Sequence, residues 1–292
     1  MSNLMATAEF DRIADVYDDT RRALDEETLD GMSGMLAKGN CHSVLEIAVG
    51  TGRVSTPLIK RGYEITGVDI SRRMMEKARG KGMANLLLAD GSSIPFKDKT
   101  FDATLMAHVF HLLEDPFPLM REGARVSRVG VFVLLRKGGF RPWFGLWGGG
   151  DNAPAEAISG NTDQGEVAKF VEERRTRFRK LAEKYHWDWN SGRGPRHWGK
   201  EEEILKSHPP DELKVVSDVV MNNSLEERIA RIEKGGYGFF SEMPVEMKRE
   251  IIKNMRDEGP TLPDWARQPS HEVNQVAMWK SETLLRIHAP KS

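Results

Sequence analysis

The stretch "VLEIAVGTGRVS", residues 44–55, joins a run of apolar residues to a cluster of glycines. Its first half belongs to "SVLEIAV", whose β-branched and long apolar residues are typical of a strand buried inside a sheet. Its second half leads into "RVSTPLIKRG", which predicts a helix that stops near Gly62. Gly50 and Gly52 therefore lie where a strand turns into a helix, and a ligand can approach the main chain there because no side chains block it.

The alternation of strand and helix patterns continues downstream. Apolar runs predict four more strands, in "YEITGVDI", "NLLLAD", "FDATLMAHVF" and "VGVFVLLRK". Between them, Ser71 caps the predicted helix "RRMMEKARGKG", and another helix is expected at residues 118–126. Upstream, residues 10–24 are expected to form an amphipathic helix, because its apolar residues recur at three- and four-residue spacing. Strands that alternate with short helices predict a parallel sheet with right-handed crossovers.

The sequence changes character after residue 140. All seven tryptophans lie beyond that point, at positions 143, 147, 187, 189, 198, 265 and 279. Helix patterns at residues 165–185, in "SLEERIARIEKGG" and in "PVEMKREIIKNMRDEG" alternate with strand patterns in "LKVVSDVVM" and "EVNQVAMWK". We expect one domain over residues 1–292, with a core of residues 1–139, 212–222 and 272–281. Residues 140–211 and 223–271 are then helical insertions that form a cap with an apolar or aromatic pocket.

Three acidic residues narrow the ligand that the glycine turn would bind. Asp69 ends the second strand, about 20 residues after the glycines, where a carboxylate hydrogen-bonds ribose hydroxyls in nucleotide-binding sheets. Glu46 precedes Gly50, and its charge repels a pyrophosphate but attracts an ammonium group. Asp90 ends the third strand and is placed to accept a hydrogen bond from an amino group such as that of adenine. A ligand with ribose, adenine, a cationic amino-acid end and no phosphate is S-adenosylmethionine (SAM).

Each of these acids also has a structural interpretation. Glu46 could pair with a neighbour near the strand end, although a lone buried carboxylate is costly. Asp69 and Asp90 could cap helices or stabilise turns. Their position at the ends of successive strands favours binding, because open α/β sheets bind ligands at the carboxyl ends of their strands.

Over residues 9 to about 137, the chain resembles the class I SAM-dependent methyltransferases, especially the small-molecule group that includes the ubiquinone and menaquinone methyltransferases. The resemblance rests on "FDRIADVYD", "VLEIAVGTGR", "GVDIS", "LLLADGSSIPFKDKTFD" and "HVFHLLEDP", in this order and at family-like spacing. It implies an α/β fold of the Rossmann-like class I methyltransferase type, with a seven-stranded, mostly parallel sheet and helical cap insertions. The chain departs from the family at Ala48, where glycine is usual, but the added methyl group is small and we expect binding to survive.

The resemblance also implies a role for each residue of the turn and the strand ends. Glu46 would lie near the methionine ammonium of SAM, Asp69 would bind the ribose, and Asp90 would bind the adenine amino group. Gly50 and Gly52 would let the cofactor approach the main chain.

Further residues complete the expected cofactor site. By the same resemblance, Ile70 packs on the adenine ring, Tyr17 and Arg21 of the first helix fold over the cofactor, and His108 lies beside the sulfonium. Plain packing is an equally good interpretation for Ile70, Met74 and Tyr17. The expected cofactor-binding set is Tyr17, Arg21, Glu46, Ala48, Gly50, Thr51, Gly52, Asp69, Ile70, Met74, Asp90, Gly91, Ser92 and His108.

His111 is the candidate catalytic residue. It follows His108 by three positions, about one helical turn, near the end of the fourth strand. A neutral histidine has a suitable pKa to take a proton from an acceptor at neutral pH. A structural role is the more common one for a histidine in such a place, and both interpretations stay open.

Composition and charge narrow the class of protein. The chain has 292 residues, of which 39% are hydrophobic, and its 43 basic and 44 acidic residues leave a net charge of −1. This balance does not favour nucleic acid or an anionic membrane as a partner. Cys41 is the only cysteine, so neither an intrachain disulfide nor a thiolate-rich metal site is expected. Neither a signal peptide nor a spanning segment is visible, and we expect a cytoplasmic protein without stable membrane insertion.

The sequence therefore predicts a SAM-dependent methyltransferase that acts on a small, partly apolar acceptor, whose accepting atom (C, N, O or S) stays open. An NAD(P)-dependent oxidoreductase is a competing hypothesis, because glycines followed by Asp69 occur there too. Glu46 and Asp90 argue against it, as does the lack of a Tyr-x-x-x-Lys pair. A SAM-binding module without catalysis would also carry these residues, and so would an RNA methyltransferase, although an RNA enzyme should show a basic surface.

Overall fold

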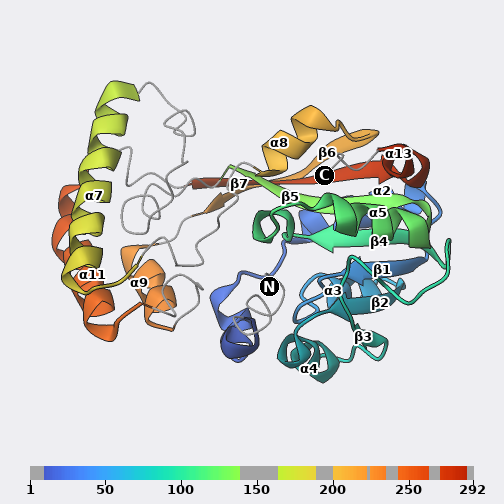
Figure 1. The fold of residues 1–292 in the computed structure, drawn as a ribbon, viewed down its shortest axis with the longest axis horizontal. Coiled ribbons are helices and arrows are strands. Elements are labelled where there is room, and N and C mark those ends of the chain that lie inside the picture. The colour runs from blue at the N-terminus through green and yellow to red at the C-terminus, as the bar shows by residue number, and fades with distance from the viewer. Residues whose placement is uncertain are drawn as a thin grey trace. The chain divides into compact units, whose positions relative to one another are not determined.

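A computed structural model describes residues 10–138, 164–188, 200–221, 224–234, 243–262 and 270–287. These residues form two compact units (Figure 1). The first unit, here called the sheet unit, comprises the described parts of residues 1–137, 200–218 and 273–292. The second, here called the helical unit, comprises those of 138–199 and 219–272. Helix α8 (Lys200–Ser207), which the sequence placed in the first insertion, groups with the sheet unit.

The sheet has seven strands in the order β3-β2-β1-β4-β5-β7-β6. β1 pairs in parallel with β2 and β4, and the β2–β3 and β4–β5 pairs are also parallel. The predicted seven-stranded, mostly parallel sheet is thereby confirmed. The strands are β1 (Ser43–Ile47), β2 (Glu64–Asp69), β3 (Leu86–Leu88), β4 (Phe101–Ala107), β5 (Ser127–Gly138), β6 (Glu212–Met221) and β7 (Ser270–Lys280).

Helices cover both faces of the sheet, as the continuous apolar strands require. Successive side chains of a strand point to opposite faces, so β1 contributes to two separate apolar clusters. Leu45 packs in the cluster that contains Met120 of α5, and Val44 packs in the one that contains Leu36 of α2. The helices on the Leu45 face are α5 (Phe117–Val126), α8 and α13 (Ser281–Arg286). Those on the Val44 face are α2 (Glu26–Lys38), α3 (Ser55–Lys60) and α4 (Arg72–Gly80).

The strand order creates a switch point between β1 and β4. From β1 the chain moves outward through β2 and β3, and it then returns to build β4 and β5 on the other side. Ile47 pairs with Met106, so the glycine turn after β1 begins beside the end of β4. Open α/β sheets bind ligands at the carboxyl ends of the strands that flank such a point.

The predicted helix at residues 10–24 is wrong over most of its length. Residues 10–13 are helical, a turn follows, and Asp18–Thr20 form a short 3-10 helix, η1. The hydroxyl of Thr20 donates to the carbonyl of Tyr17 (2.8 Å), and the Asp18 carboxylate accepts from the hydroxyl of Thr51 (2.6 Å). Contacts with the rest of the sheet unit therefore override the helical periodicity of this segment.

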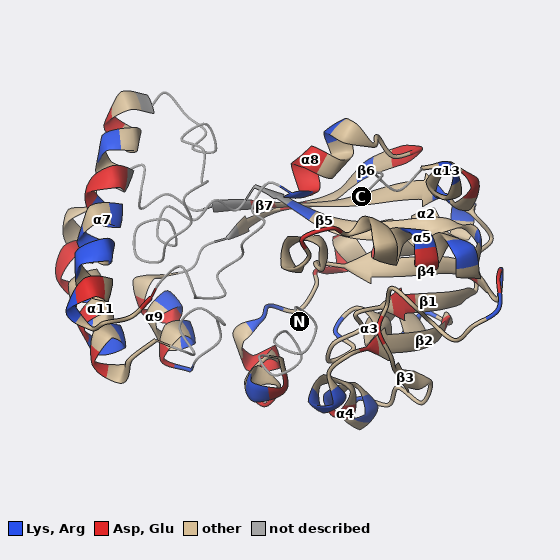
Figure 2. Ribbon diagram, in the orientation of Figure 1, with Lys and Arg blue, Asp and Glu red and all other residues tan. Residues whose placement is uncertain are grey.

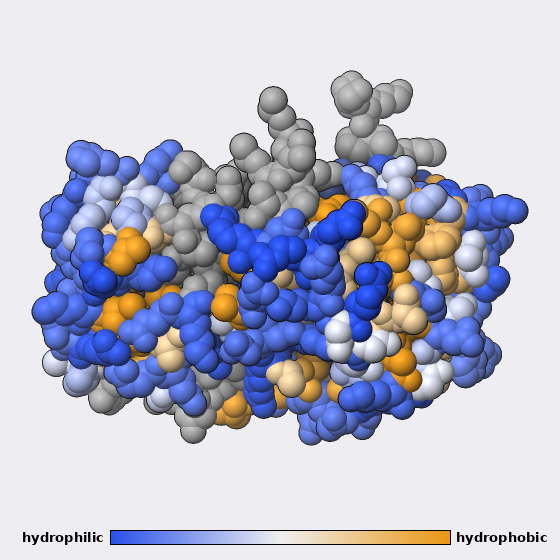
Figure 3. Space-filling view, turned by 90° about the horizontal axis from the view of Figure 1, so that it is seen from below, coloured by the Kyte–Doolittle hydropathy of each residue, from blue (hydrophilic) through white to orange (hydrophobic). Residues whose placement is uncertain are grey.

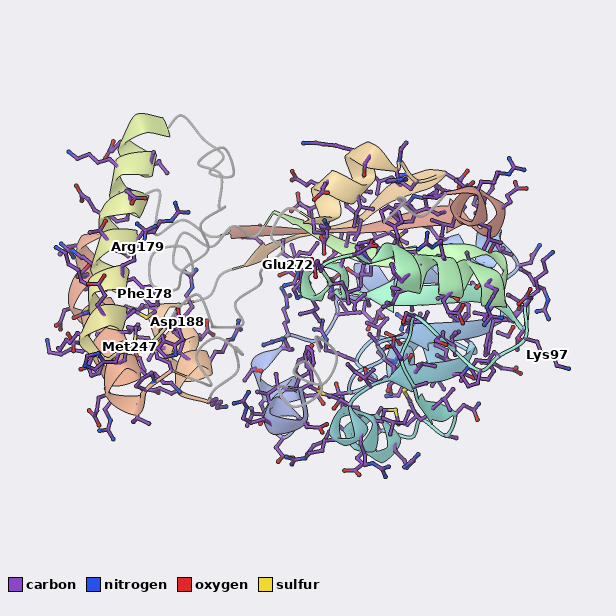
Figure 4. The ribbon with its side chains drawn as sticks, in the orientation of Figure 1. Lys97, Phe178, Arg179, Asp188, Met247 and Glu272 are labelled. Carbon is purple, nitrogen blue, oxygen red and sulfur yellow. The ribbon has the colours of Figure 1, made fainter. Side chains whose placement is uncertain are left out.

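The helical unit has an apolar core of its own. Its helices are α7 (Gln164–Lys184), α9 (Leu225–Glu233) and α11 (Val245–Glu258), followed by the 3-10 helix η4 (Gly259–Thr261). Phe178 of α7 and Met247 of α11, both labelled in Figure 4, belong to the same buried cluster. The predicted capping box of α9, Ser224 with Glu227, is present.

Ion pairs join α7 to α11 in an antiparallel arrangement. Arg174, in the middle of α7, pairs with Glu258 at the end of α11 (2.6 Å), whereas Lys184 at the end of α7 pairs with Glu250 in the middle of α11 (2.6 Å). Both signs of charge occur along the two helices (Figure 2), as expected for solvated faces.

Two of the seven tryptophans lie in the described residues. Trp187 packs against the core of the helical unit, with its ring edge-on to Phe178 at 6.1 Å. Trp279 is fully buried in the sheet unit, and its indole N–H donates to the carbonyl of His208 (2.9 Å). The expected cluster of residues 143, 147, 187, 189 and 198 lies outside the described residues except for Trp187.

Hydrophilic side chains cover most of the described surface visible in Figure 3, with smaller hydrophobic patches among them. Within the described ranges, none of the helices combines the length and the apolar character needed to cross a bilayer.

Candidate active site

The turn after β1 adopts left-handed backbone conformations. Ala48, Gly50 and Gly52 have φ values of +61°, +56° and +71°. A Cβ atom at Gly52 would lie 2.6 Å from the sulfur of Met83, so this glycine is needed for packing. A Cβ at Gly50 would meet nothing within 4 Å. The open space expected for a ligand is therefore at Gly50.

Glu46 is a buried carboxyl beside this turn. It is 1% exposed and accepts a hydrogen bond from the hydroxyl of Ser55, the first residue of α3. Burial, with a smaller contribution from the neighbouring Asp69, raises the pKa of Glu46 to about 8, although the Ser55 hydroxyl and Arg53 oppose the shift. A buried carboxyl with a raised pKa favours a cation as its partner, because a nearby positive charge would stabilise its ionised form.

Asp69 organises the glycine turn from the end of β2. Its carboxylate accepts hydrogen bonds from the main-chain N–H of Gly50 (2.7 Å) and from that of Ser71 (2.8 Å). Burial raises the pKa of Asp69, and these N–H groups oppose that effect. The sequence predicted the carboxylate at this position but not its bond to the turn.

Asp90 follows β3 and lies half-buried in a turn. Its carboxylate accepts from the main-chain N–H (2.9 Å) and the hydroxyl (2.7 Å) of Ser92. A Cβ at Gly91 would lie 2.4 Å from a methyl group of Ile47, so Gly91 allows this turn to pack on the end of β1. Ile70, expected to contact adenine, is half-buried next to Asp69.

The segment before α2 reaches the turn through Asp18, which bonds Thr51 and also pairs with Lys81 (2.5 Å). In the same segment, the guanidinium of Arg21 lies 4.8 Å from the ring centre of Tyr17. Met74 of α4 is 2% exposed and packs with Ile13 and Ala14 of this segment.

His108 and His111 are brought together at the end of β4. His108 has a φ of +52°, and its main-chain N–H donates to the carbonyl of Leu134 in β5 (3.1 Å). Its Nε2 atom is buried and has no hydrogen-bond partner among the described residues. His111 lies in the 3-10 helix η2 (Phe110–Leu112), and its charge acts on His108.

Several residues near the site were not predicted from the sequence. Asp18 and Ser55 contact predicted residues directly, and Arg136 of β5 acts electrostatically on His108. The carboxylate of Glu201, in α8, accepts from the main-chain N–H of Arg136. Only Ser55 had a local sequence signal, as a polar residue at the start of a helix that follows glycines. Glu201 had none, because it is about 65 residues away from Arg136 in the chain.

Comparison with known proteins identifies the domain that carries this site. Residues 45–135 match a family described as a methyltransferase domain. These residues form a methyltransferase domain. The match runs from β1 into β5 and so contains the glycine turn, Asp69, Asp90 and both histidines. The resemblance inferred from the sequence is thereby confirmed, against the hypothesis of an oxidoreductase.

Curated relatives support the same domain over part of their length. A demethylmenaquinone methyltransferase of Thermotoga maritima is 34% identical over 134 residues, which cover 43% of this chain and 58% of that one. A phosphatidylethanolamine N-methyltransferase of Cereibacter sphaeroides is 33% identical over 99 residues, which cover 32% of this chain and 48% of that one. The chain thus spans about half of the length of these relatives.

A solved structure extends the likeness of fold beyond the methyltransferase domain. A putative methyltransferase from an antibiotic biosynthesis pathway of Anabaena variabilis has a TM-score of 0.53 at 11% identity. The match covers 88% of this chain and 98% of that one. It supports the class I methyltransferase fold.

Proposed function

We propose that this protein is a SAM-dependent methyltransferase that acts on a small, partly apolar acceptor. The observation that carries the proposal is the pair of carboxylates around the glycine turn, Glu46 and Asp69. Burial raises the pKa of both, so a cation is favoured beside them and a phosphate is not. SAM brings an ammonium group, a ribose and an adenine, which match Glu46, Asp69 and Asp90 in turn.

The chain's own residues supply binding and alignment in this mechanism. Bound SAM provides a methyl group on a sulfonium, whose charge is lost as the methyl carbon bonds to a lone pair of the acceptor. Glu46 holds the amino-acid end, Asp69 keeps the turn in shape, and the buried surroundings of His108 keep water away. Such a reaction gains mainly from proximity and from a dry site.

Titration calorimetry tests the cofactor assignment. SAM and its demethylated product, S-adenosylhomocysteine, should bind, and NAD should give no heat of binding. Asp69→Ala should weaken SAM binding by about 1–3 kcal/mol, the scale for losing a buried hydrogen-bond partner. Asp102→Ala is the matched control. Asp102 also accepts from main-chain N–H groups, those of His42 (3.0 Å) and Ser43 (2.9 Å), but at the amino ends of the strands, away from the candidate site. Binding of NAD without SAM contradicts the proposal.

His111 is proposed as a general base for acceptors that lose a proton. The proposal rests on its place beside His108 at the end of β4. His111→Ala should lower the single-turnover rate by about a hundredfold while SAM affinity stays nearly constant. A near-normal rate at saturating acceptor would assign His111 a structural role.

The insertions at residues 140–211 and 223–271 are proposed to cap the acceptor. The support is topological. β5 runs parallel to β4, so the chain leaves β5 at the carboxyl ends of the strands, where the candidate site lies. Hydrogen exchange in these segments should slow when both SAM and an acceptor are present. Equal protection in the free and bound protein contradicts the cap. The cytoplasmic location and the absence of a nucleic-acid partner stay predictions from the sequence.

A further inference from the structure

A chain of hydrogen-bonded side chains connects the start of α2 to the strands β6 and β7. At one end, the Asp25 carboxylate accepts from the hydroxyl of Thr28 (2.9 Å). The hydroxyls of Thr28 and Ser217 lie 2.8 Å apart, and the side-chain N–H of Asn274 donates to the Ser217 oxygen (3.0 Å). Thr28, Ser217 and Asn274 are 0%, 4% and 1% exposed, so these bonds lie inside the protein.

The carboxylate fixes the direction of each bond in this chain. An ionised carboxylate only accepts, so the single proton of the Thr28 hydroxyl is given to Asp25. Ser217 then donates either to Thr28 or, over a longer distance, to Asp25 (3.4 Å), and in both cases its own proton is used. The Ser217 oxygen can therefore only accept from Asn274, which turns the amide nitrogen of Asn274 toward Ser217.

Asn274 Oδ1 is left as a hydrogen-bond acceptor that has nothing to accept. It is buried and has no partner among the described residues, although buried polar atoms are usually paired. Turning the amide over would not relieve it, because Oδ1 would then meet the Ser217 oxygen with no proton between them. An acceptor atom held in this way is complementary to an N–H or O–H group of a ligand.

Two contacts show that β7 runs antiparallel to its neighbour β5. At the start of β5, the carbonyl of Ser127 accepts from the hydroxyl of Ser281, the residue that follows β7 (3.1 Å). Further along β5, Gly130 lies against Trp279, because a Cβ atom at Gly130 would be 2.2 Å from the Trp279 carbonyl oxygen. Residue numbers therefore fall along β7 as they rise along β5.

This register places Asn274 level with the candidate site. It lies beside Leu134 or the next residue of β5, and Leu134 pairs with Ala107, the last residue of β4. His108 follows Ala107, and its Nε2 atom is also buried without a partner among the described residues. Only β5 separates β4 from β7, so the two main chains are about 10 Å apart. Two unpaired buried polar atoms thus occur at one level of the sheet, where the candidate site lies.

We propose that Asn274 Oδ1 accepts a hydrogen bond from the methyl acceptor, which therefore carries an N–H or O–H group, as an alcohol, a phenol or an amine does. This inference rests on the proposed function and narrows its substrate class. The donor group is part of the acceptor and need not be the atom that is methylated. A molecule with only lone pairs at this place, such as an ether, would leave Oδ1 unpaired, and a site built around a buried polar atom rejects such ligands.

NMR titration of three small probes tests the inference, in the presence of saturating S-adenosylhomocysteine. Phenol, aniline and fluorobenzene have nearly the same size, but only phenol and aniline donate a hydrogen bond. Each of these two should bind about tenfold more tightly than fluorobenzene. Fluorobenzene that binds as tightly as phenol and aniline, or no binding of these two at about 10 mM, overturns the inference. A failure of S-adenosylhomocysteine to bind overturns the proposed function itself, so the two failures are distinguishable.

Variants of β6 and β7 assign the preference for phenol over fluorobenzene to Asn274. Asn274→Leu has a similar size and no amide, so it should abolish the preference. Ser217→Ala removes the group that orients the amide, so its nitrogen can face the probe and the preference should fall about threefold or more. Gln275→Leu is the control and should keep the preference, because side chains of successive strand residues point to opposite faces.

Thermal unfolding of each variant confirms its fold. A purely structural role of Asn274 would change the unfolding temperature and leave the preference for phenol intact, so an unchanged preference in Asn274→Leu contradicts the proposal. If Asn274→Leu does not fold, Ser217→Ala decides, and an unchanged preference in that variant contradicts the proposal in the same way.

Discussion

At the scale of single residues, Glu46 links the protonation state of the protein to its ligand. Its pKa is about 8 in the folded protein, against a usual value of 4.5. The folded protein therefore holds a proton that the unfolded chain has lost between these pH values, and the free energy of unfolding should fall as pH rises through this window. The slope reaches at most about 1.4 kcal/mol per pH unit.

Replacing this carboxyl should remove both the dependence of stability on pH and the release of a proton on SAM binding. An ammonium group stabilises the ionised form of Glu46, so SAM binding at pH 7 should release about one proton in the wild type. Glu46→Gln should release none and should flatten the dependence of stability on pH. Calorimetry in buffers of different ionisation enthalpy measures the proton. Release of the same number of protons by both proteins would assign the raised pKa to another group.

Ala48 carries strain that glycine would relieve. Its φ of +61° costs an L-residue about 1–2 kcal/mol, and glycine adopts it freely. Ala48→Gly should therefore raise the free energy of unfolding by up to about 1 kcal/mol, after the greater entropy of glycine in the unfolded chain is subtracted. Ala37→Gly, on the exposed side of α2, should lower it by about 1 kcal/mol. Urea unfolding measures both, and the same sign for the two variants would contradict this explanation.

How well single residues could be predicted depended on whether their signal was local. Glu46, Asp69 and Asp90 were predicted because a strand end is visible as an apolar run that meets a polar residue or glycine. Arg136 and Glu201 were missed because the fold brings them together from β5 and α8, and neither has a motif.

At the scale of elements, the segment before α2 is held to the glycine turn by a polar contact. Asp18 connects Thr51 (2.6 Å) to Lys81 (2.5 Å). Asp18→Ala should weaken SAM binding about three- to tenfold, since one hydrogen bond contributes about 0.5–1.5 kcal/mol. Asp15→Ala, which removes exposed ion pairs with Arg73 (2.5 Å) and Lys77 (2.7 Å), should change it little. Equal effects of the two variants in a calorimetric titration would contradict a specific role for the turn contact.

The same segment shows where periodicity misleads. Its apolar residues recur at helical spacing, and Ile13 and Ala14 do pack on Met74 as an apolar face should. The helix nevertheless ends early, because Asp18 finds its partner, Thr51, outside this segment. Helix α2 was missed although Asp25 caps it through the N–H of Thr28 (2.8 Å), a signal that the sequence does contain.

At the scale of the whole molecule, each unit has its own apolar core, so the protein should unfold in two steps. S-adenosylhomocysteine at a hundred times its dissociation constant should stabilise the sheet unit by about 2.7 kcal/mol and should shift only that transition. Ser224→Ala, which removes the cap of α9, should lower the stability of the helical unit by about 1 kcal/mol and should shift only the transition of that unit. Scanning calorimetry resolves the two steps, and a single transition that moves as a whole in both experiments would contradict independent cores.

Because the two units interrupt one another along the chain, neither can be finished early during synthesis. β5 lies between β4 and β7 in the sheet, and β7 ends only at Lys280. The partners of α7 in its core likewise come only after β6. At the ribosome's pace of about 5–20 residues per second, β5 waits roughly 7–28 s with an open edge. A nascent chain in this state exposes unpaired main-chain groups, so its yield in the cell should depend on chaperones that shield such edges.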